Sequence, residues 1–225
     1  MCGIAGYSLS GSSSVDRTLS AQSLLAGIAE RGADAVGYAH RGPSGPVEVH
    51  KQRSGASELL DQITIPTEAV EALVHVRDYT KGHPSIAANN HPVRHGPVVG
   101  IHNGIITNDD ELLERHHCAR AEPQMTVDSE AIFAVAAHSR SNARALEELE
   151  GAMAAAWLDE REPELVHLAR GTGRPLWLVL VFLLDQLRLV QKRQQRDRRL
   201  RGELGMGFRK GHSLRSPYRP VPWTP

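Results

Sequence analysis

The chain opens with Met1-Cys2-Gly3-Ile4-Ala5-Gly6-Tyr7, a stretch that joins a reactive side chain to the start of a strand. An apolar run from Ile4 to Leu9 ends at a Gly-Ser-rich loop, which predicts a first strand inside the fold. Methionine before a small residue is ordinarily removed, so we expect a mature chain that begins with Cys2. Its thiol and free α-amine, with pKa values near about 8.5 and about 7.7–8.0, would supply a nucleophile and its base. Taken alone, Cys2 could equally be a small buried residue of an edge strand.

Composition and charge favour one globular domain followed by a tail. The 225 residues are 40% hydrophobic and carry 26 basic and 26 acidic side chains, a net charge of zero that favours neither a nucleic-acid-binding nor a membrane-surface protein. The longest apolar run, Leu176 to Leu184, is much shorter than the roughly 20 residues that span a membrane. Two cysteines, without a basic and apolar leader before them, predict a cytoplasmic protein without a disulfide scaffold.

The charge is divided unevenly along the chain. Residues 1–178 hold 15 basic and 23 acidic side chains, whereas 179–225 hold 11 and 3. The last ten residues include four prolines. We therefore predict a domain over 1–178 and a divergent, basic, partly disordered tail over 179–225, with a short basic helix after Gln186.

Hydrophobic periodicity predicts a mixed set of strands and helices. Strands are expected at 4–9, 35–40, 46–51, 72–76, 98–102, 152–158, 165–169 and 176–181, and helices at 19–28, 109–116, 128–138 and 142–150. Hairpin connections outnumber regular strand–helix–strand crossovers in this order. The pattern therefore favours an α+β fold of antiparallel sheets with helical layers.

Six further motifs follow the N-terminal cysteine in a fixed order. They are Arg31-Gly-Ala-Asp-Ala-Val-Gly37, His75-Val-Arg77 with Thr80 and Gly82, Asn90-His-Pro92, His102-Asn-Gly-Ile-Ile106, Thr126-Val-Asp-Ser-Glu130 and Leu168-Ala-Arg-Gly-Thr-Gly-Arg-Pro-Leu176. The series resembles the class II glutamine amidotransferase domains, which are N-terminal-nucleophile hydrolases, and is most similar to the glutaminase domain of the glucosamine-6-phosphate synthase type. This resemblance implies a four-layer αββα sandwich of antiparallel sheets.

The resemblance also implies roles for individual residues. Cys2 would attack the side-chain amide of glutamine and release ammonia and glutamate. Arg77, with Thr80, would bind the α-carboxylate, and Asp128 would bind the α-ammonium. The Asn103 side-chain amide and the Gly104 backbone N–H would stabilise the oxyanion. Arg31 and Asp34 are expected to organise the core beside the site, and His75, His91 and His102 to be structural.

The sequence departs from the family at several points. Asp78 and Lys81 stand where an aromatic residue and a histidine are usual, and the resemblance ends near residue 178. No acceptor domain is evident, so a separate ammonia-accepting synthase subunit is a possible partner. Neither a cofactor nor a metal is expected, since adjacent residues of His116-His117-Cys118 point apart on a helix.

Two other functions remain open from the sequence. The chain could be an N-terminal-nucleophile amidase that acts on another amide. It could also be a catalytically idle binding domain whose basic tail contacts a partner or, less plausibly, nucleic acid. The retained nucleophile, amino-acid clamp and oxyanion groups favour a glutaminase.

Overall fold

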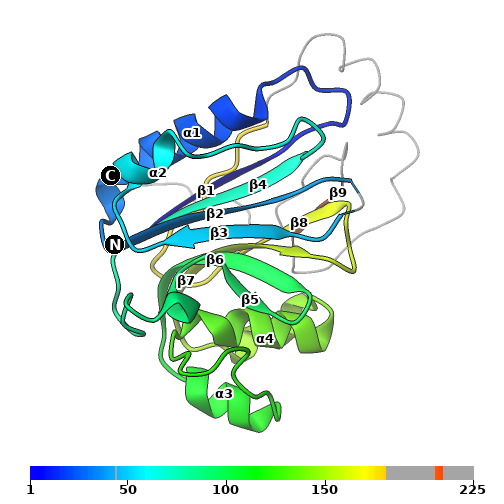
Figure 1. The fold of residues 1–225 in the computed structure, drawn as a ribbon. Coiled ribbons are helices and arrows are strands. Elements are labelled where there is room, and N and C mark those ends of the chain that lie inside the picture. The colour runs from blue at the N-terminus through cyan, green and yellow to red at the C-terminus, as the bar shows by residue number, and fades with distance from the viewer. Residues whose placement is uncertain (44, 181–205, 210–225) are drawn as a thin grey trace, which may run out of the picture.

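The computed structural model describes residues 1–43, 45–180 and the backbone of 206–209, and within these it contains two antiparallel sheets. The first has the order β1-β4-β2-β3 and is built from β1 (Gly3–Ser8), β2 (Ala35–Arg41), β3 (Glu48–Gln52) and β4 (Glu71–Arg77). The second has the order β5-β6-β7-β8-β9 and is built from β5 (Val93–His95), β6 (Val98–Ile106), β7 (Gly151–Asp159), β8 (Leu165–Arg170) and β9 (Met206–Arg209). The two sheets lie face to face (Figure 1).

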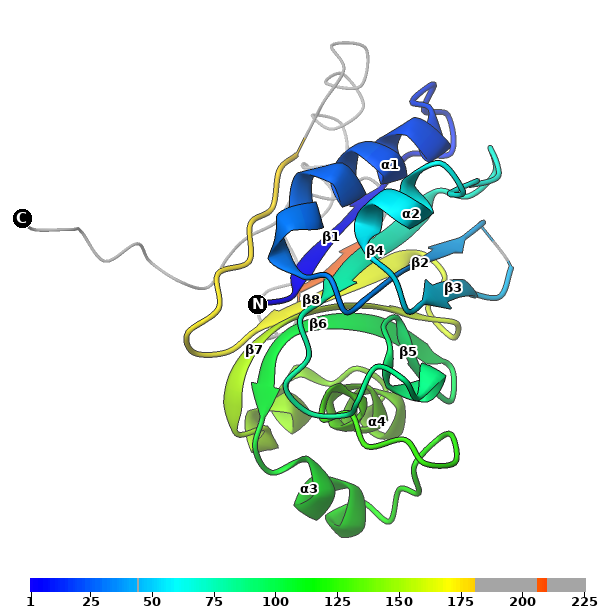
Figure 2. The ribbon, with the colours of Figure 1, turned by 60° about the vertical axis from the view of Figure 1, so that its left-hand side comes forward.

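Helices cover both outer faces of this pair of sheets. They are α1 (Arg17–Ile28), α2 (Ala56–Leu60), α3 (Asp109–Arg115) and α4 (Ser129–Ser139), with 3₁₀ turns η1 (Ala29–Arg31), η2 (Ala87–Asn89) and η3 (Ala143–Glu148). Figures 1 and 2 show α1 and α2 over the first sheet and α4 over the second. The predicted α+β αββα sandwich is therefore confirmed. In the described part of the chain, no helix is long and apolar enough to cross a membrane.

Three apolar cores separate these four layers. Leu25 of α1 packs on the first sheet, and Phe133 of α4 packs on the second. Between the sheets, Leu73 of β4 meets Val99 and Ile101 of β6. Since side chains alternate along a strand, the residues of β6 at odd positions face the first sheet and those at even positions face α4.

The helix boundaries follow local signals in the sequence. At the start of α1, the Asp16 side chain accepts a hydrogen bond from the Leu19 N–H at 2.8 Å, a regular N-cap. The middle of α4, from Ala131 to Ala136, is buried throughout, as expected of a helix enclosed by a sheet and its neighbouring segments.

Two predicted elements differ from the structure. The helix expected at 142–150 is the 3₁₀ turn η3, which begins at the Asn142 cap. The strand expected at 176–181 is wrong for 176–180, which belong to neither sheet, and the edge of β8 pairs with β9. β9 falls inside the range predicted as the tail, whereas the predicted basic helix lies outside the described residues.

A buried ion pair links the two sheets at the end far from Cys2. Arg41 Nε donates to Glu71 Oε2 at 2.7 Å, and the same guanidinium donates to the backbone carbonyls of Asp159 at 2.7 Å and Leu165 at 2.9 Å. The side chains of both Arg41 and Glu71 are fully buried. The pair therefore fixes β2 and β4 to the far ends of β7 and β8.

We expect Arg41→Met to lower the free energy of unfolding by about 3–5 kcal/mol, because it removes the cation that faces a buried carboxylate. Arg41→Met combined with Glu71→Met should recover much of this loss, since no buried charge then remains at the pair. Urea denaturation of the three proteins measures both effects. A loss below about 1 kcal/mol in the single variant would show that the pair contributes little.

Candidate functional site

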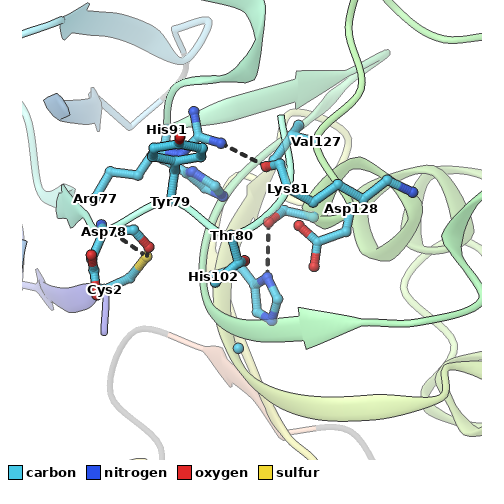
Figure 3. A pocket seen from close by; sticks show the side chains of 12 residues that line it. Cys2, Arg77, Asp78, Tyr79, Thr80, Lys81, His91, His102, Val127 and Asp128 are labelled. Atoms are coloured by element: carbon cyan, nitrogen blue, oxygen red, sulfur yellow. Dashed lines mark hydrogen bonds between the residues drawn. The ribbon is translucent and has the colours of Figure 1, made fainter. Parts of the chain in front are cut away.

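A small pocket forms where β1 begins and β4 ends. The antiparallel register pairs Gly3 with Val76, so Cys2 lies beside Arg77. The pocket is lined by Cys2, Arg77, Asp78, Tyr79, Thr80, Lys81, His91, His102, Gly104, Val127, Asp128 and Ser129 (Figure 3). Five of the six predicted site residues, Cys2, Arg77, Thr80, Gly104 and Asp128, are thus brought together from four separate parts of the sequence.

Cys2 is held against the segment that follows β4. Its Sγ lies 3.4 Å from the Asp78 carbonyl oxygen and accepts from the Asp78 N–H at 3.5 Å. Arg31 Nε donates to the Cys2 carbonyl at 3.1 Å, and the Met1 α-ammonium pairs with the Asp78 carboxylate. Burial raises the pKa of the Cys2 thiol. A nucleophilic Cys2 therefore needs a nearby base to accept its proton.

The Arg77 guanidinium is nearly buried and already anchored on one side. It donates to Asn90 Oδ1 at 2.7 Å, to the Lys81 carbonyl at 2.9 Å and to the Gly82 carbonyl. Gly82 has a φ of +80°, a backbone conformation that favours glycine. These three hydrogen bonds leave two of the five N–H donors of arginine for a ligand.

Asp128 lies across the pocket from Cys2, immediately before α4 (Figure 3). Its Oδ2 accepts from the Ile106 N–H at 2.7 Å, which fixes the carboxylate to the end of β6. Burial raises the pKa of this carboxyl group. A bound ammonium group would offset that effect, so the site suits a cationic ligand group.

The strand expected at 98–102 extends to Ile106 in the structure, so Asn103 and Gly104 lie inside β6. Gly104 pairs with Met153 of β7, has a φ of +153°, and a Cβ there would lie 1.8 Å from the Ala152 carbonyl oxygen. Only glycine suits this close approach of two strands. The uninterrupted pairing of β6 with β7 overrides the turn tendency of Asn-Gly.

Asn103 is the one predicted site residue that does not line the pocket. It occupies an odd position of β6, so its side chain shares the face of Val99 and Ile101 that packs on the first sheet. Asn103 is buried, and its side-chain amide makes no hydrogen bond with any described residue. Within the described part of the chain, the two N–H donors of this amide are therefore not engaged.

Three histidines form a neutral layer behind the pocket. His75 Nε2 lies 3.0 Å from the His102 carbonyl oxygen, and the rings of His75 and His91 stack with centroids 4.2 Å apart. His102 Nδ1 lies 2.8 Å from Ser129 Oγ, which joins β6 to α4. Burial lowers the pKa of His75 to about 3 and that of His102 to about 4. At neutral pH these rings are uncharged.

Sequence reasoning missed the residues that hold the site together. Asn90 accepts from Arg77 and donates to the Pro84 carbonyl at 2.9 Å, so it connects the arginine to the following loop. Its place in the Asn90-His-Pro92 motif is the feature of the sequence that could have identified Asn90 as a site residue. The contacts of Lys81 with Asp109 and Asp110 had no signal in the sequence, because they join positions 28 and 29 residues apart.

The pocket is too small for an amino acid in this conformation. Its internal volume is about 10 Å³, roughly the room for one water molecule. Residues 78–81 supply a third of the lining, and Asp78, Tyr79 and Thr80 are exposed. This wall of the pocket therefore lies at the surface of the molecule.

Comparison with known proteins identifies relatives of this chain. A family model described as a glutamine amidotransferase domain matches residues 78–180. The chain is 31% identical over 193 residues to the glutamine–fructose-6-phosphate aminotransferase (isomerizing) of Escherichia coli O6:H1, which covers 78% of this chain and 29% of the relative. The corresponding protein of Zymomonas mobilis is 38% identical over 112 residues, 46% of this chain and 18% of the relative.

A solved structure shares the fold. The glutamine phosphoribosylpyrophosphate amidotransferase of B. subtilis superposes with a TM-score of 0.53 at 17% identity, over 75% of this chain and 36% of that chain. This chain spans less than a third of the length of the curated relatives. The matching domain model, the related sequences and the shared sandwich lead to one conclusion: residues 78–180 match a glutamine amidotransferase domain, and the fold around them is the sandwich of the N-terminal-nucleophile type.

Proposed function

We propose that this chain hydrolyses glutamine, the ammonia-releasing half of an amidotransferase reaction. The observation that carries the proposal is the placement of the Cys2 thiol beside Arg77, with Asp128 across the same pocket. An amino acid bound here would place its α-carboxylate on the cation Arg77 and its α-ammonium on the anion Asp128. Its side-chain amide would then lie near the nucleophile Cys2.

The reaction proceeds in two steps from the mature chain that begins at Cys2. The α-amine accepts the thiol proton, and the Sγ thiolate attacks the side-chain amide carbon of glutamine. The tetrahedral intermediate collapses as the α-ammonium returns a proton to the leaving nitrogen, which departs as ammonia. Water then cleaves the γ-glutamyl thioester, which releases glutamate and restores the thiol.

The other site residues bind the substrate and stabilise the intermediate. Two remaining N–H donors of Arg77, together with Thr80, bind the α-carboxylate, and Asp128 binds the α-ammonium. The Gly104 N–H and the Asn103 amide donate to the developing oxyanion. Rotation of the Asn103 side chain toward the nucleophile is part of this proposal.

The ammonia is consumed by another unit. The curated relatives are named aminotransferases, so we infer that an ammonia-accepting synthase unit uses the ammonia. Both cysteines are free, which supports a reducing, cytoplasmic location.

A direct assay tests the proposed function. Purified protein, with removal of Met1 checked by intact mass, is incubated with glutamine, and glutamate and ammonia are measured separately. Equal amounts of both products support the proposal. Asparagine and simple primary amides are supplied in parallel, and turnover of these without turnover of glutamine would indicate another amidase.

The pH profile should show one acidic limb. The α-amine accepts a proton only when neutral, so kcat/KM falls up to tenfold per pH unit below a pKa near about 7.7–8.0. His75 and His102, with pKa values of about 3 and about 4, stay neutral and add no limb between pH 5 and 8. Initial rates from pH 5 to 9 check this. A level profile from pH 5.5 to 8 would contradict a catalytic amine.

A further inference from the structure

An ion-pair cluster lies beside the pocket and takes no part in the chemistry described above. Lys81 Nζ donates to both carboxylate oxygens of Asp109 at 2.7 Å and to Asp110 Oδ2 at 2.9 Å. Asp109 is 2% exposed, whereas Lys81 is 37% exposed at its side chain. Hence Lys81 ties the segment after Arg77 to the first turn of α3.

Arg120 binds the same two carboxylates from the other side. Its guanidinium donates to Asp109 Oδ2 at 3.0 Å and to Asp110 Oδ1 at 2.5 Å. It also donates to Glu130 Oε2 at 3.1 Å and to the Val127 carbonyl at 2.8 Å. The Val127 and Glu130 contacts bracket Asp128, so Arg120 holds the segment that carries this carboxylate.

The cluster therefore joins both halves of the proposed amino-acid clamp. On one side, the Lys81 backbone carbonyl accepts from the Arg77 guanidinium at 2.9 Å. On the other, the Arg120 contacts fix the segment around Asp128. The hydrogen bonds from Lys81 and Arg120 lower the pKa of Asp110. Partial burial by itself lowers the pKa of the Lys81 ammonium group. Its hydrogen bonds to Asp109 and Asp110 outweigh this effect, so the pKa is raised.

We propose that Lys81, Asp109, Asp110 and Arg120 form an ionic latch that sets the spacing between Arg77 and Asp128 and thereby determines glutamine affinity. Lys81 and Arg120 are positioning residues in this proposal, which rests on the proposed glutaminase function. The latch acts on substrate binding because none of its side chains reaches Cys2. It follows that its loss weakens binding and leaves the bond-breaking step nearly unchanged.

The test measures affinity and turnover separately. Glutamine binding is measured by calorimetry in a Cys2→Ala background, where bound glutamine is not consumed, and kcat and KM are measured with Cys2 intact. Lys81→Met removes the ammonium but keeps an apolar stem, and we expect Kd and KM to rise roughly tenfold with kcat within about twofold. Lys81→Arg should restore most of the affinity, because it restores the charge.

Arg115→Met is the matched control. Arg115 also lies on the α3 side of the molecule and pairs with Glu111 and Glu148, but it contacts neither the Lys81 segment nor Asp128. Its loss should leave Kd, KM and kcat unchanged. An equal effect of Arg115→Met and Lys81→Met would overturn the latch, since it would point to general surface charge.

Salt gives an independent readout. Lys81 and Asp110 are partly exposed, so salt screens their attraction. Raising the ionic strength from about 0.05 to 0.5 M should raise Kd in the parent several-fold and affect Lys81→Met much less. Equal salt dependence in the two proteins would argue against the proposal.

The remaining outcomes are also decisive. A folded Lys81→Met protein with unchanged Kd, or with a lower kcat at unchanged Kd, refutes the latch. If Lys81→Met does not fold, Asp110→Asn removes only the exposed carboxylate and should raise Kd about threefold; an unchanged Kd there refutes the latch too. If the parent neither binds nor hydrolyses glutamine, the proposed function itself fails, and the latch with it.

Discussion

Cys2→Ala is expected to lower glutamine hydrolysis by roughly 10⁴-fold or more, to the background rate of the assay. The substitution keeps an N-terminal α-amine after processing but removes the sulfur atom that forms the thioester. Cys2 is only half-buried, so the fold should persist. Product formation under saturating glutamine measures the loss, and the thermal unfolding temperature of the variant shows that the protein remains folded.

Cys118→Ala is the control for this substitution. Cys118 follows α3, its Sγ lies 3.6 Å from the His116 carbonyl oxygen, and it is not part of the pocket. Its removal should leave kcat and KM unchanged. A protein that demonstrably retains Met1 should be inactive, because its Cys2 nitrogen is an amide. Full activity in Cys2→Ala or in the Met1-retaining form would refute the mechanism.

Asn103→Ala is expected to lower kcat by roughly 10²-fold or more with little change in KM. The reason is that an oxyanion donor acts in the transition state, whereas Arg77 and Asp128 hold the ground-state substrate. Steady-state kinetics on the purified variant separates these effects. The Asn103 side chain makes no hydrogen bond with a described residue, so the variant loses no such bond within the described part of the chain.

Asn142→Ala provides the same chemical change away from the site. Asn142 caps η3, where its side chain accepts from the Arg144 N–H at 3.0 Å. It should leave both kinetic constants unchanged. A higher KM with unchanged kcat in Asn103→Ala would instead place Asn103 among the substrate-binding residues.

The sequence by itself determined most strands and helices of the layered fold and five of the twelve residues that line the pocket. The apolar run after Cys2, the Asp16 cap and the strand-length runs at 72–76 and 152–158 are local features, and local features select strands and helices. Arg77 and Thr80 follow a predicted strand, and Asp128 precedes a predicted helix. The resemblance to the class II glutamine amidotransferase domains implied that these residues share one site.

Tertiary structure alone decided how those residues are held. Strand pairing with β7 placed Asn103 and Gly104 inside β6, and β9 pairs with β8 whereas residues 176–180, expected in a strand, lie in neither sheet. The partners of Arg41 and Lys81 come from distant positions, the Asp159 carbonyl 118 residues away and Asp109 28 residues away. Strand register and ion pairs are set by competition among non-local partners, and that competition is resolved only when the layers pack together.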